Sequence, residues 1–205
     1  MMSIVIAQNT KTKERALLRS PLTLLSVAVM VCGLVLFGQG LWIHAKAYAA
    51  QILLERAFTQ SIASGNKVKP WSWADTWPVA RIEAPRLAAS AIALNGASGQ
   101  ALAFGPGHLQ NTPKAGETGT AVYAAHRDTH FAFLKDVEKG DLIRITRDDG
   151  KIFTYRATQM TVTRWDEAQI DIHASGSNLV LATCYPFDAV TQGPLRYLVY
   201  AELVE

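Results

Sequence analysis

Cysteine is scarce in this sequence, and the two cysteines present are poorly placed to pair. Among 205 residues, only Cys32 and Cys184 carry thiols. Cys32 lies inside a long apolar run, whereas Cys184 lies in the part of the chain that has the composition of a folded domain. A disulfide between them would have to join a residue of an apolar segment to a residue of a water-soluble domain. A disulfide-stabilised fold is therefore excluded, and Cys184 is a lone thiol that needs a chemical reason.

Several motifs with well-defined chemistry are also missing. The chain has no glycine-rich phosphate loop, no Walker pattern and no paired-cysteine metal signature. Its formal net charge of +3 owes much to basic residues near the N-terminus and gives no reason to expect nucleic acid as a partner. We expect no cofactor and no metal.

Charge is absent from Pro21 to Ile43, a run of 23 residues. A helix of that length crosses the roughly 30 Å hydrocarbon core of a bilayer. The preceding residues 1–20 form a basic tail, with Lys11, Lys13, Arg15 and Arg19 against Glu14. Positive charge holds a terminus in the cytoplasm. The pattern thus predicts a single-pass anchor in the inner (plasma) membrane, a cytoplasmic N-terminus, and all later residues on the periplasmic (extracytoplasmic) side.

A cleavable signal peptide is the alternative, because Ala47-Tyr48-Ala49 fits a small-x-small cleavage site. The apolar run is, however, longer than the usual h-region of about 7–15 residues. We therefore expect the helix to be retained as a signal anchor.

Residues 44–78 are predicted to form a helical stalk followed by a connector. Ala45–Ser64 is predicted to be helical because its apolar residues recur on one stripe, and Gly65 is a suitable stop. The connector contains Trp71, Trp73 and Trp77 between two prolines. These tryptophans fit either the headgroup level of a membrane or the surface of the following domain.

From Val79 onward, short β-type runs alternate with turn residues, which predicts one mainly β domain over residues 79–205. Asp148-Asp149-Gly150 is the clearest hairpin signal, and a short helix is expected near Ala132–Val137. Regular short strands favour a closed or nearly closed barrel, or a sandwich. The predicted strands are Val79–Ile82, Ala91–Leu94, Ala121–Ala125, Asp141–Thr146, Lys151–Thr163, Asn178–Thr183 and Arg196–Leu203.

One histidine, one cysteine and one arginine stand at or near the ends of these strands. They are His126, Cys184 and Arg196. A sulfur nucleophile, an imidazole that moves protons and a fixed cation for an oxyanion are the groups that acyl transfer needs. The pattern predicts acyl transfer through a thioester on Cys184.

Each of these residues also has a plainer interpretation. Cys184 and His126 can be buried structural residues, and Arg196 can pair with a surface carboxylate. On a strand, His126, Asp128 and His130 would share a face, which could form a metal site with His108 or His173 as a further ligand. Because no other ligand cluster supports that site, we expect His108 and His173 to be structural or peripheral.

Six short motifs follow one another along the second part of the chain. They are Gly105-Pro106-Gly107-His108, Pro113-Lys114-Ala115-Gly116-Glu117, Ala125-His126-Arg127-Asp128-Thr129-His130-Phe131, Lys139-Gly140-Asp141, Leu181-Ala182-Thr183-Cys184 and Pro194-Leu195-Arg196. In their order and rough spacing they resemble the sortases, over roughly residues 79–205. The resemblance implies a sortase-like closed β-barrel with a few short helices, and cleavage of a C-terminal LPXTG-like sorting signal between Thr and Gly. It also implies that the acyl group then passes from the cysteine to an amine acceptor in the cell envelope.

The resemblance also implies residue roles. Cys184 matches the nucleophile, His126 the general acid and base, Arg196 the group that steadies the substrate carbonyl or oxyanion, and Thr183 a position that contacts substrate. The runs around His126 and Cys184 look most like the class found in Gram-negative bacteria. Val180 and Ala125 replace a Thr and a Gly of the usual pattern, which removes no catalytic atom.

Other function classes remain open beside a membrane-anchored cysteine transpeptidase. A cysteine protease would give the acyl group to water. An L,D-transpeptidase would show His-Gly-Cys with an arginine two residues after the cysteine, whereas Arg196 is twelve residues on. A non-catalytic β-module would keep Cys184 inaccessible to alkylating reagents.

Overall fold

The computed structural model describes residues 21–191 and 193–204. The basic tail 1–20, predicted to be cytoplasmic, lies outside the described residues. The chain divides into two compact units, Met1–Ala49 and Ala50–Glu205, and each is described by itself.

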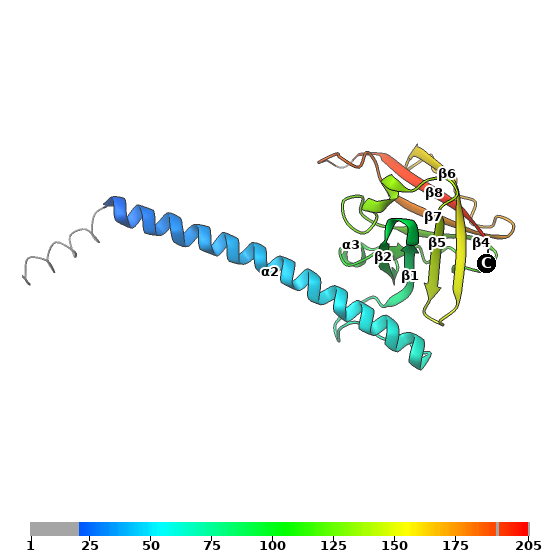
Figure 1. The fold of residues 1–205 in the computed structure, drawn as a ribbon, viewed down its shortest axis with the longest axis horizontal. Coiled ribbons are helices and arrows are strands. Elements are labelled where there is room, and N and C mark those ends of the chain that lie inside the picture. The colour runs from blue at the N-terminus through cyan, green and yellow to red at the C-terminus, as the bar shows by residue number, and fades with distance from the viewer. Residues whose placement is uncertain (1–20, 192, 205) are drawn as a thin grey trace, which may run out of the picture. The chain divides into compact units, whose positions relative to one another are not determined.

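One continuous helix, α2 (Pro21–Ser64), contains the apolar run and the predicted stalk helix (Figure 1). The two join because no proline or glycine interrupts the chain between Gly40 and Gly65. Gly65, with a φ of 67°, ends the helix, and its N–H donates to the carbonyl of Ser61 at 2.9 Å. By length and composition, α2 is suited to cross a membrane.

The last turns of α2 pack into the second unit. Leu54 and Phe58 are fully buried together with Ile92 and Leu94 of that unit. Arg81 pairs with Glu55 and places its guanidinium 5.2 Å from the centre of the Phe58 ring. This end of the helix is therefore part of the folded unit that carries the strands.

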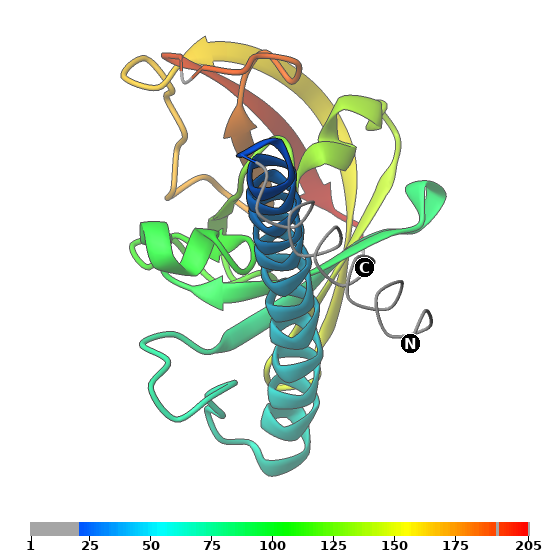
Figure 2. The ribbon, with the colours of Figure 1, turned by 90° about the vertical axis from the view of Figure 1, so that its left-hand side faces the viewer.

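Eight strands close into a barrel in the order β1-β2-β3-β4-β7-β8-β6-β5. Two neighbouring pairs, β2/β3 and β4/β7, are parallel, and the others are antiparallel. β6 and β8 curve along each other (Figure 2). The strands are β1 (Pro78–Ala84), β2 (Ala89–Asn95), β3 (Gly107–His108), β4 (Gly119–Ala124), β5 (Leu142–Arg147), β6 (Ile152–Arg164), β7 (Ser177–Cys184) and β8 (Leu195–Leu203).

The predicted mainly β fold is confirmed as a barrel, so the sandwich alternative is wrong. All seven predicted strands form, and Gly150 adopts a φ of 80° in the predicted hairpin between β5 and β6. The predicted short helix is a 3-10 turn, η2 (Ala132–Asp136). The sequence did not predict β3, the 3-10 turn η1 (Pro85–Leu87) or the short helix α3 (Gly99–Leu102).

The barrel is filled by apolar side chains that alternate along the strands. β1 has a strict buried/half-buried alternation, and Tyr123, Tyr155 and Leu181 are among the largest fully buried residues. A smaller apolar cluster lies on the outer face, where Val122, Val180 and Leu198 pack with Ile170 of the β6–β7 loop. This outer face of β4, β7 and β8 leads to the candidate site.

The tryptophans of the connector have different surroundings. Trp71 contacts Phe104 edge-on, with ring centroids 5.0 Å apart. The Trp77 ring is covered by Lys67, whereas Trp73 is 80% exposed. At least Trp71 therefore lies against the domain surface.

Candidate active site

His126 and Cys184 leave the same end of two neighbouring parallel strands. In the β4/β7 register, Ala124 pairs with Ala182, and the Ala125 N–H continues the ladder by donating to the Ala182 carbonyl at 3.1 Å. His126 and Cys184 each lie two residues beyond that alanine pair. Since neighbouring strands are about 4.8 Å apart, the register brings the imidazole and the thiol to one place.

Arg196 enters from the third strand. It is the register partner of Cys184 in the antiparallel β7/β8 pair. Its Nη1 donates to the carbonyls of Gly193 at 2.9 Å and Leu195 at 2.8 Å. Arg196 forms no ion pair with any described carboxylate, so the interpretation as a surface salt bridge is wrong. His126, just beyond the end of β4, and the opposed pair Cys184 and Arg196 on β7 and β8 thus form one row at the same end of three neighbouring strands.

Two cavities meet at this row. The larger, of about 500 Å³, contains both arginines of the site, Arg127 and Arg196, with the carboxylate of Asp128. The smaller, of about 320 Å³, is mostly apolar. Cys184 is half-buried and lines both cavities. The larger is lined by His126, Arg127, Asp128, Thr129, Cys184, Val190, Gly193 and Arg196.

The apolar cavity extends from the row along the outer barrel face. Val122, Ala124, Ala182 and Leu198 form its floor, and Trp165, Ala168 and Ile170 of the β6–β7 loop also line it. Sequence reasoning missed these loop residues, because periodicity identifies strands but not which face a loop covers. It also assigned no role to Arg127, Thr129, Val190 and Gly193, although each lies close in sequence to His126 or Arg196.

Thr183 joins the two strand ends. Its side chain is buried, and Oγ1 donates to the carbonyl of Ala125 at 2.7 Å. Ala125 directly precedes His126, and Thr183 directly precedes Cys184, so this bond connects the backbone segments that carry both side chains. Thr183 also lines the apolar cavity.

The premise of the alternative metal site is wrong, because residues 127–130 form a turn instead of continuing β4. That turn is closed by the Phe131 N–H, which donates to the His126 carbonyl at 3.1 Å. Within residues 21–191 and 193–204, no three His, Cys, Asp or Glu side chains converge. Burial, and then the nearby His126, lowers the pKa of His130.

His108 has a structural position in β3. Its Nε2 lies 2.9 Å from the carbonyl of Pro113, and its ring packs on Tyr123 with centroids 5.0 Å apart. Burial is the main cause that lowers the pKa of His108. His173 is exposed in the β6–β7 loop.

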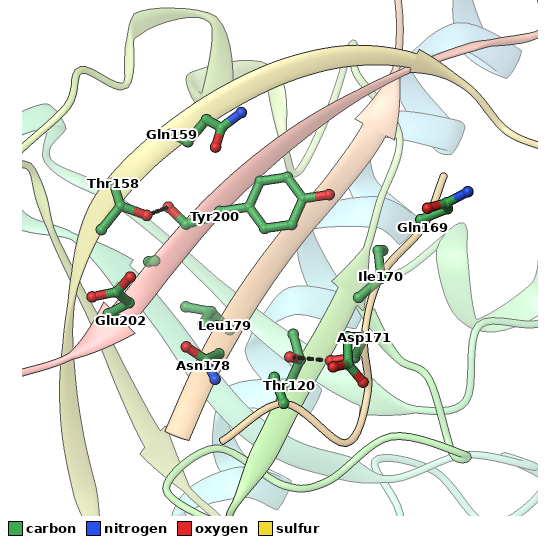
Figure 3. A pocket seen from close by; sticks show the side chains of 12 residues that line it. Thr120, Thr158, Gln159, Gln169, Ile170, Asp171, Asn178, Leu179, Tyr200 and Glu202 are labelled. Carbon is green, nitrogen blue, oxygen red and sulfur yellow. Dashed lines mark hydrogen bonds between the residues drawn. The ribbon is translucent and has the colours of Figure 1, made fainter. Parts of the chain in front are cut away.

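A third cavity, of about 310 Å³, lies at the far end of the same barrel face (Figure 3). Thr120, Asn178 and Glu202, which are paired across β4, β7 and β8, line this cavity. They lie six residues along their strands from the row of Cys184, or about 20 Å away. Thr120 Oγ1 donates to the Asp171 carbonyl at 2.7 Å, and the Tyr200 ring points toward the loop (Figure 3). Its lining contains neither cysteine nor histidine, so it lacks the thiol and the imidazole of the candidate site.

Comparison with known proteins identifies the fold and the family. The family model of the sortase domain matches residues 82–204. Sortase D of Bacillus subtilis (strain 168) is 32% identical over 124 residues, which cover 60% of this chain and 62% of that protein. The match thus spans less than two thirds of that relative's length.

Solved structures agree with this match. A Clostridium perfringens sortase D5 transpeptidase superposes with a TM-score of 0.62 at 20% identity, covering 77% of this chain and 99% of that one. The structure of sortase C-1 from Actinomyces oris superposes with a TM-score of 0.56 at 28% identity, covering 62% of this chain and 73% of that one. Together with the barrel and the row of His126, Cys184 and Arg196, the domain match establishes that this chain belongs to the sortases, a family of cysteine transpeptidases.

Proposed function

We propose that this chain is a membrane-anchored sortase that cleaves an LPXTG-like C-terminal sorting signal of an exported protein and transfers that protein to an amine acceptor in the cell envelope. The observation that supports this proposal is the single row of His126, Cys184 and Arg196 at the ends of three neighbouring strands. A nucleophile, a proton carrier and a fixed cation are thereby aligned on rigid elements, at the junction of two cavities.

In the proposed reaction, the Cys184 thiol passes its proton to His126, and the sulfur attacks the scissile carbonyl between Thr and Gly of the signal. The carbonyl oxygen becomes an oxyanion, and His126 gives a proton to the departing amine as the C–N bond breaks. This leaves a thioester on Cys184. In the second half, the acceptor amine attacks the thioester, His126 takes its proton, and the C–S bond breaks. The proton then returns from His126 to the sulfur, which restores the Cys184 thiol.

Arg196 is proposed to hold the oxyanion. Its Nη1 is already committed to two backbone carbonyls, which fixes the plane of the guanidinium. An arginine has five N–H donors, so Nε and Nη2 retain donors for substrate. Donors that are positioned before the reaction stabilise the developing charge without reorganisation.

The two cavities suggest how the signal lies. We propose that the apolar cavity of about 320 Å³ takes the apolar side chains that precede the scissile bond. Thr183, which lines this cavity, would contact substrate while its hydroxyl holds the strand ends. The cavity of about 500 Å³ then receives the acceptor.

The apolar helix supports the proposed location. We propose that residues 21–43 remain as a single-pass anchor in the inner membrane, with residues 1–20 in the cytoplasm. Residues 44–78 would connect this anchor to the catalytic barrel, residues 79–205, on the periplasmic side. The runs around His126 and Cys184 support membership of the Gram-negative class of sortases.

The test uses the full chain in lipid nanodiscs and a peptide panel that varies each position of an LPXTG-like motif, analysed by mass spectrometry. We expect cleavage only between Thr and the following residue, and loss of cleavage when the motif is scrambled. The Cys184→Ala variant is the control for contaminating proteases. Cleavage that ignores the motif would contradict the proposed substrate class.

A further inference from the structure

Arg127 links the segment that carries His126 to a loop more than sixty residues away. Its Nη2 donates to the carbonyl of Ala189, and also to the carbonyl of Thr191 at 2.9 Å. Both acceptors belong to the β7–β8 loop, of which the structure describes residues 185–191 and 193–194. This loop begins directly after Cys184 and ends shortly before Arg196.

The base of this loop has its own support. The Tyr185 N–H donates to the Leu195 carbonyl at 3.1 Å, and Phe187 packs edge-on against Tyr197 with centroids 5.2 Å apart. The far part of the loop is different. Val190, between the two acceptors of Arg127, has a fully exposed side chain (100%), so burial of that side chain does not hold the loop there.

The part held by Arg127 is a wall of the larger cavity. Val190 and Gly193 line that cavity, and so does Arg127 itself. Arg196 holds the other end of the same loop through the Gly193 carbonyl. The loop is thus fixed by one arginine beside the histidine and another opposite the cysteine.

The guanidinium of Arg127 uses only part of its donor capacity on the loop. Both bonds to the loop come from Nη2 and go to neutral carbonyls, and Nη1 is buried without a hydrogen-bond partner. Among the described residues Arg127 forms no ion pair, although Asp128 lines the same cavity. A lysine carries its ammonium on a flexible stem and presents no fixed plane of donors, so it would hold the same carbonyls less rigidly.

From these contacts we infer that Arg127 is a positioning residue, which holds the β7–β8 loop as a wall of the cavity beside Cys184 and thereby sets the affinity for substrate. This inference rests on the proposed function for its effect on substrate. Its effect on the loop is independent of any substrate.

The experiment compares Arg127→Gln and Arg127→Lys in the full chain with Arg144→Gln as the matched control. Arg144 is exposed on β5 and lines neither cavity at the row. Hydrogen exchange followed by mass spectrometry measures the backbone N–H groups between Phe187 and Leu195, where Pro194 contributes none. We expect about tenfold faster exchange there in Arg127→Gln, a smaller increase in Arg127→Lys, and parent-like exchange in the rest of the barrel and in the control.

Kinetics with a cleaved sorting peptide give the second readout. We expect KM to rise about tenfold in Arg127→Gln while kcat stays within about threefold, because a loosened wall removes binding common to ground and transition states. Iodoacetamide is small and does not depend on the loop for binding, so the rate at which it alkylates Cys184 should equal that of the parent. Unchanged loop exchange in both variants, or equal exchange gains across the whole barrel, would overturn the inference. If the parent cleaves no sorting peptide, the proposed function fails, and loop exchange still decides the role of Arg127.

Discussion

Cys184 and Arg196 are paired residues of the β7/β8 ladder, the last pair of a register that begins with Asn178 and Glu202. Directly opposed residues in an antiparallel pair have Cβ atoms about 4.5–5.5 Å apart. The ladder therefore places the two side chains opposite each other at their Cβ atoms, and the carbonyls of Gly193 and Leu195 then fix the guanidinium of Arg196.

Replacing Arg196 by lysine should lower kcat/KM on the order of 10²-fold, by analogy with the loss of one oxyanion donor. Lysine keeps the charge but lacks the planar fork that bonds two carbonyls and a substrate at once. Steady-state cleavage of a sorting peptide measures this, with Arg156→Lys on the exposed side of β6 as the matched control. Activity within about threefold of the parent would make Arg196 a structural residue.

Thr183→Val should destabilise the fold by about 1–3 kcal/mol, because it leaves the buried carbonyl of Ala125 without its donor. Thr183→Ser keeps the hydroxyl and should stay close to the parent. Thermal unfolding measures the loss of stability, and kcat/KM measures how far His126 and Cys184 lose their alignment. Equal stability of the valine and serine variants would show that this hydrogen bond contributes little.

His126→Ala should abolish cleavage, whereas His130→Ala should retain part of it, since only His126 shares the row with Cys184. An excess of EDTA should leave the cleavage rate of the parent unchanged, because in the proposed mechanism His126 transfers protons and binds no metal. Loss of activity on chelation, with recovery on adding zinc, would contradict that assignment.

The buried imidazole of His108 should make stability fall in acid. Its folded pKa lies below the ordinary value of 6.5, mainly through burial and in part through Lys114, while the hydrogen bond to the Pro113 carbonyl and, more weakly, Glu117 act in the opposite sense. Between the folded pKa and about 6.5, the unfolded chain binds more protons than the folded chain, so the free energy of unfolding decreases as the pH falls through that window.

Urea titrations of the parent and of His108→Gln between pH 8 and pH 5 test this expectation. The variant should show a smaller decrease in stability below about pH 6.5, where the imidazole would otherwise take up a proton. His173→Gln, at an exposed position, serves as the control and should follow the parent. A steeper acid loss of stability in His108→Gln than in the parent would mean that His108 stabilises the fold in acid, the opposite of the expected effect.

Much of the fold followed from the sequence because alternating apolar residues and turn residues are local signals. They located seven strands and the Asp149-Gly150 hairpin. β3 was missed because its two residues, Gly107 and His108, are too few to show a period. The sequence predicted the stalk helix as an element separate from the apolar run, but both belong to α2. The change from apolar to mixed composition near Ile43 does not interrupt the helical backbone.

The members of the candidate site followed from residue type and motif, but their alignment did not. The register shows that Cys184 and Arg196 are opposed, and the linings of both cavities show that His126 lies with them. The turn after β4 removes Asp128 and His130 from that strand face. The bonds of Arg127 to the β7–β8 loop span more than sixty residues, so no local pattern could reveal them.

The central claim is that Cys184 forms a thioester which an amine resolves in preference to water. The most direct measurement is intact-protein mass spectrometry of the full chain, mixed with a sorting peptide and quenched in acid, with and without hydroxylamine. Cys32→Ala is the background, so that Cys184 is the only thiol in the protein. The account predicts an adduct of the acyl fragment on Cys184, its faster loss with hydroxylamine, and a hydroxamate product. An adduct that no amine diverts from hydrolysis at any concentration would indicate a cysteine protease, and cleavage that persists in Cys184→Ala would contradict the account altogether.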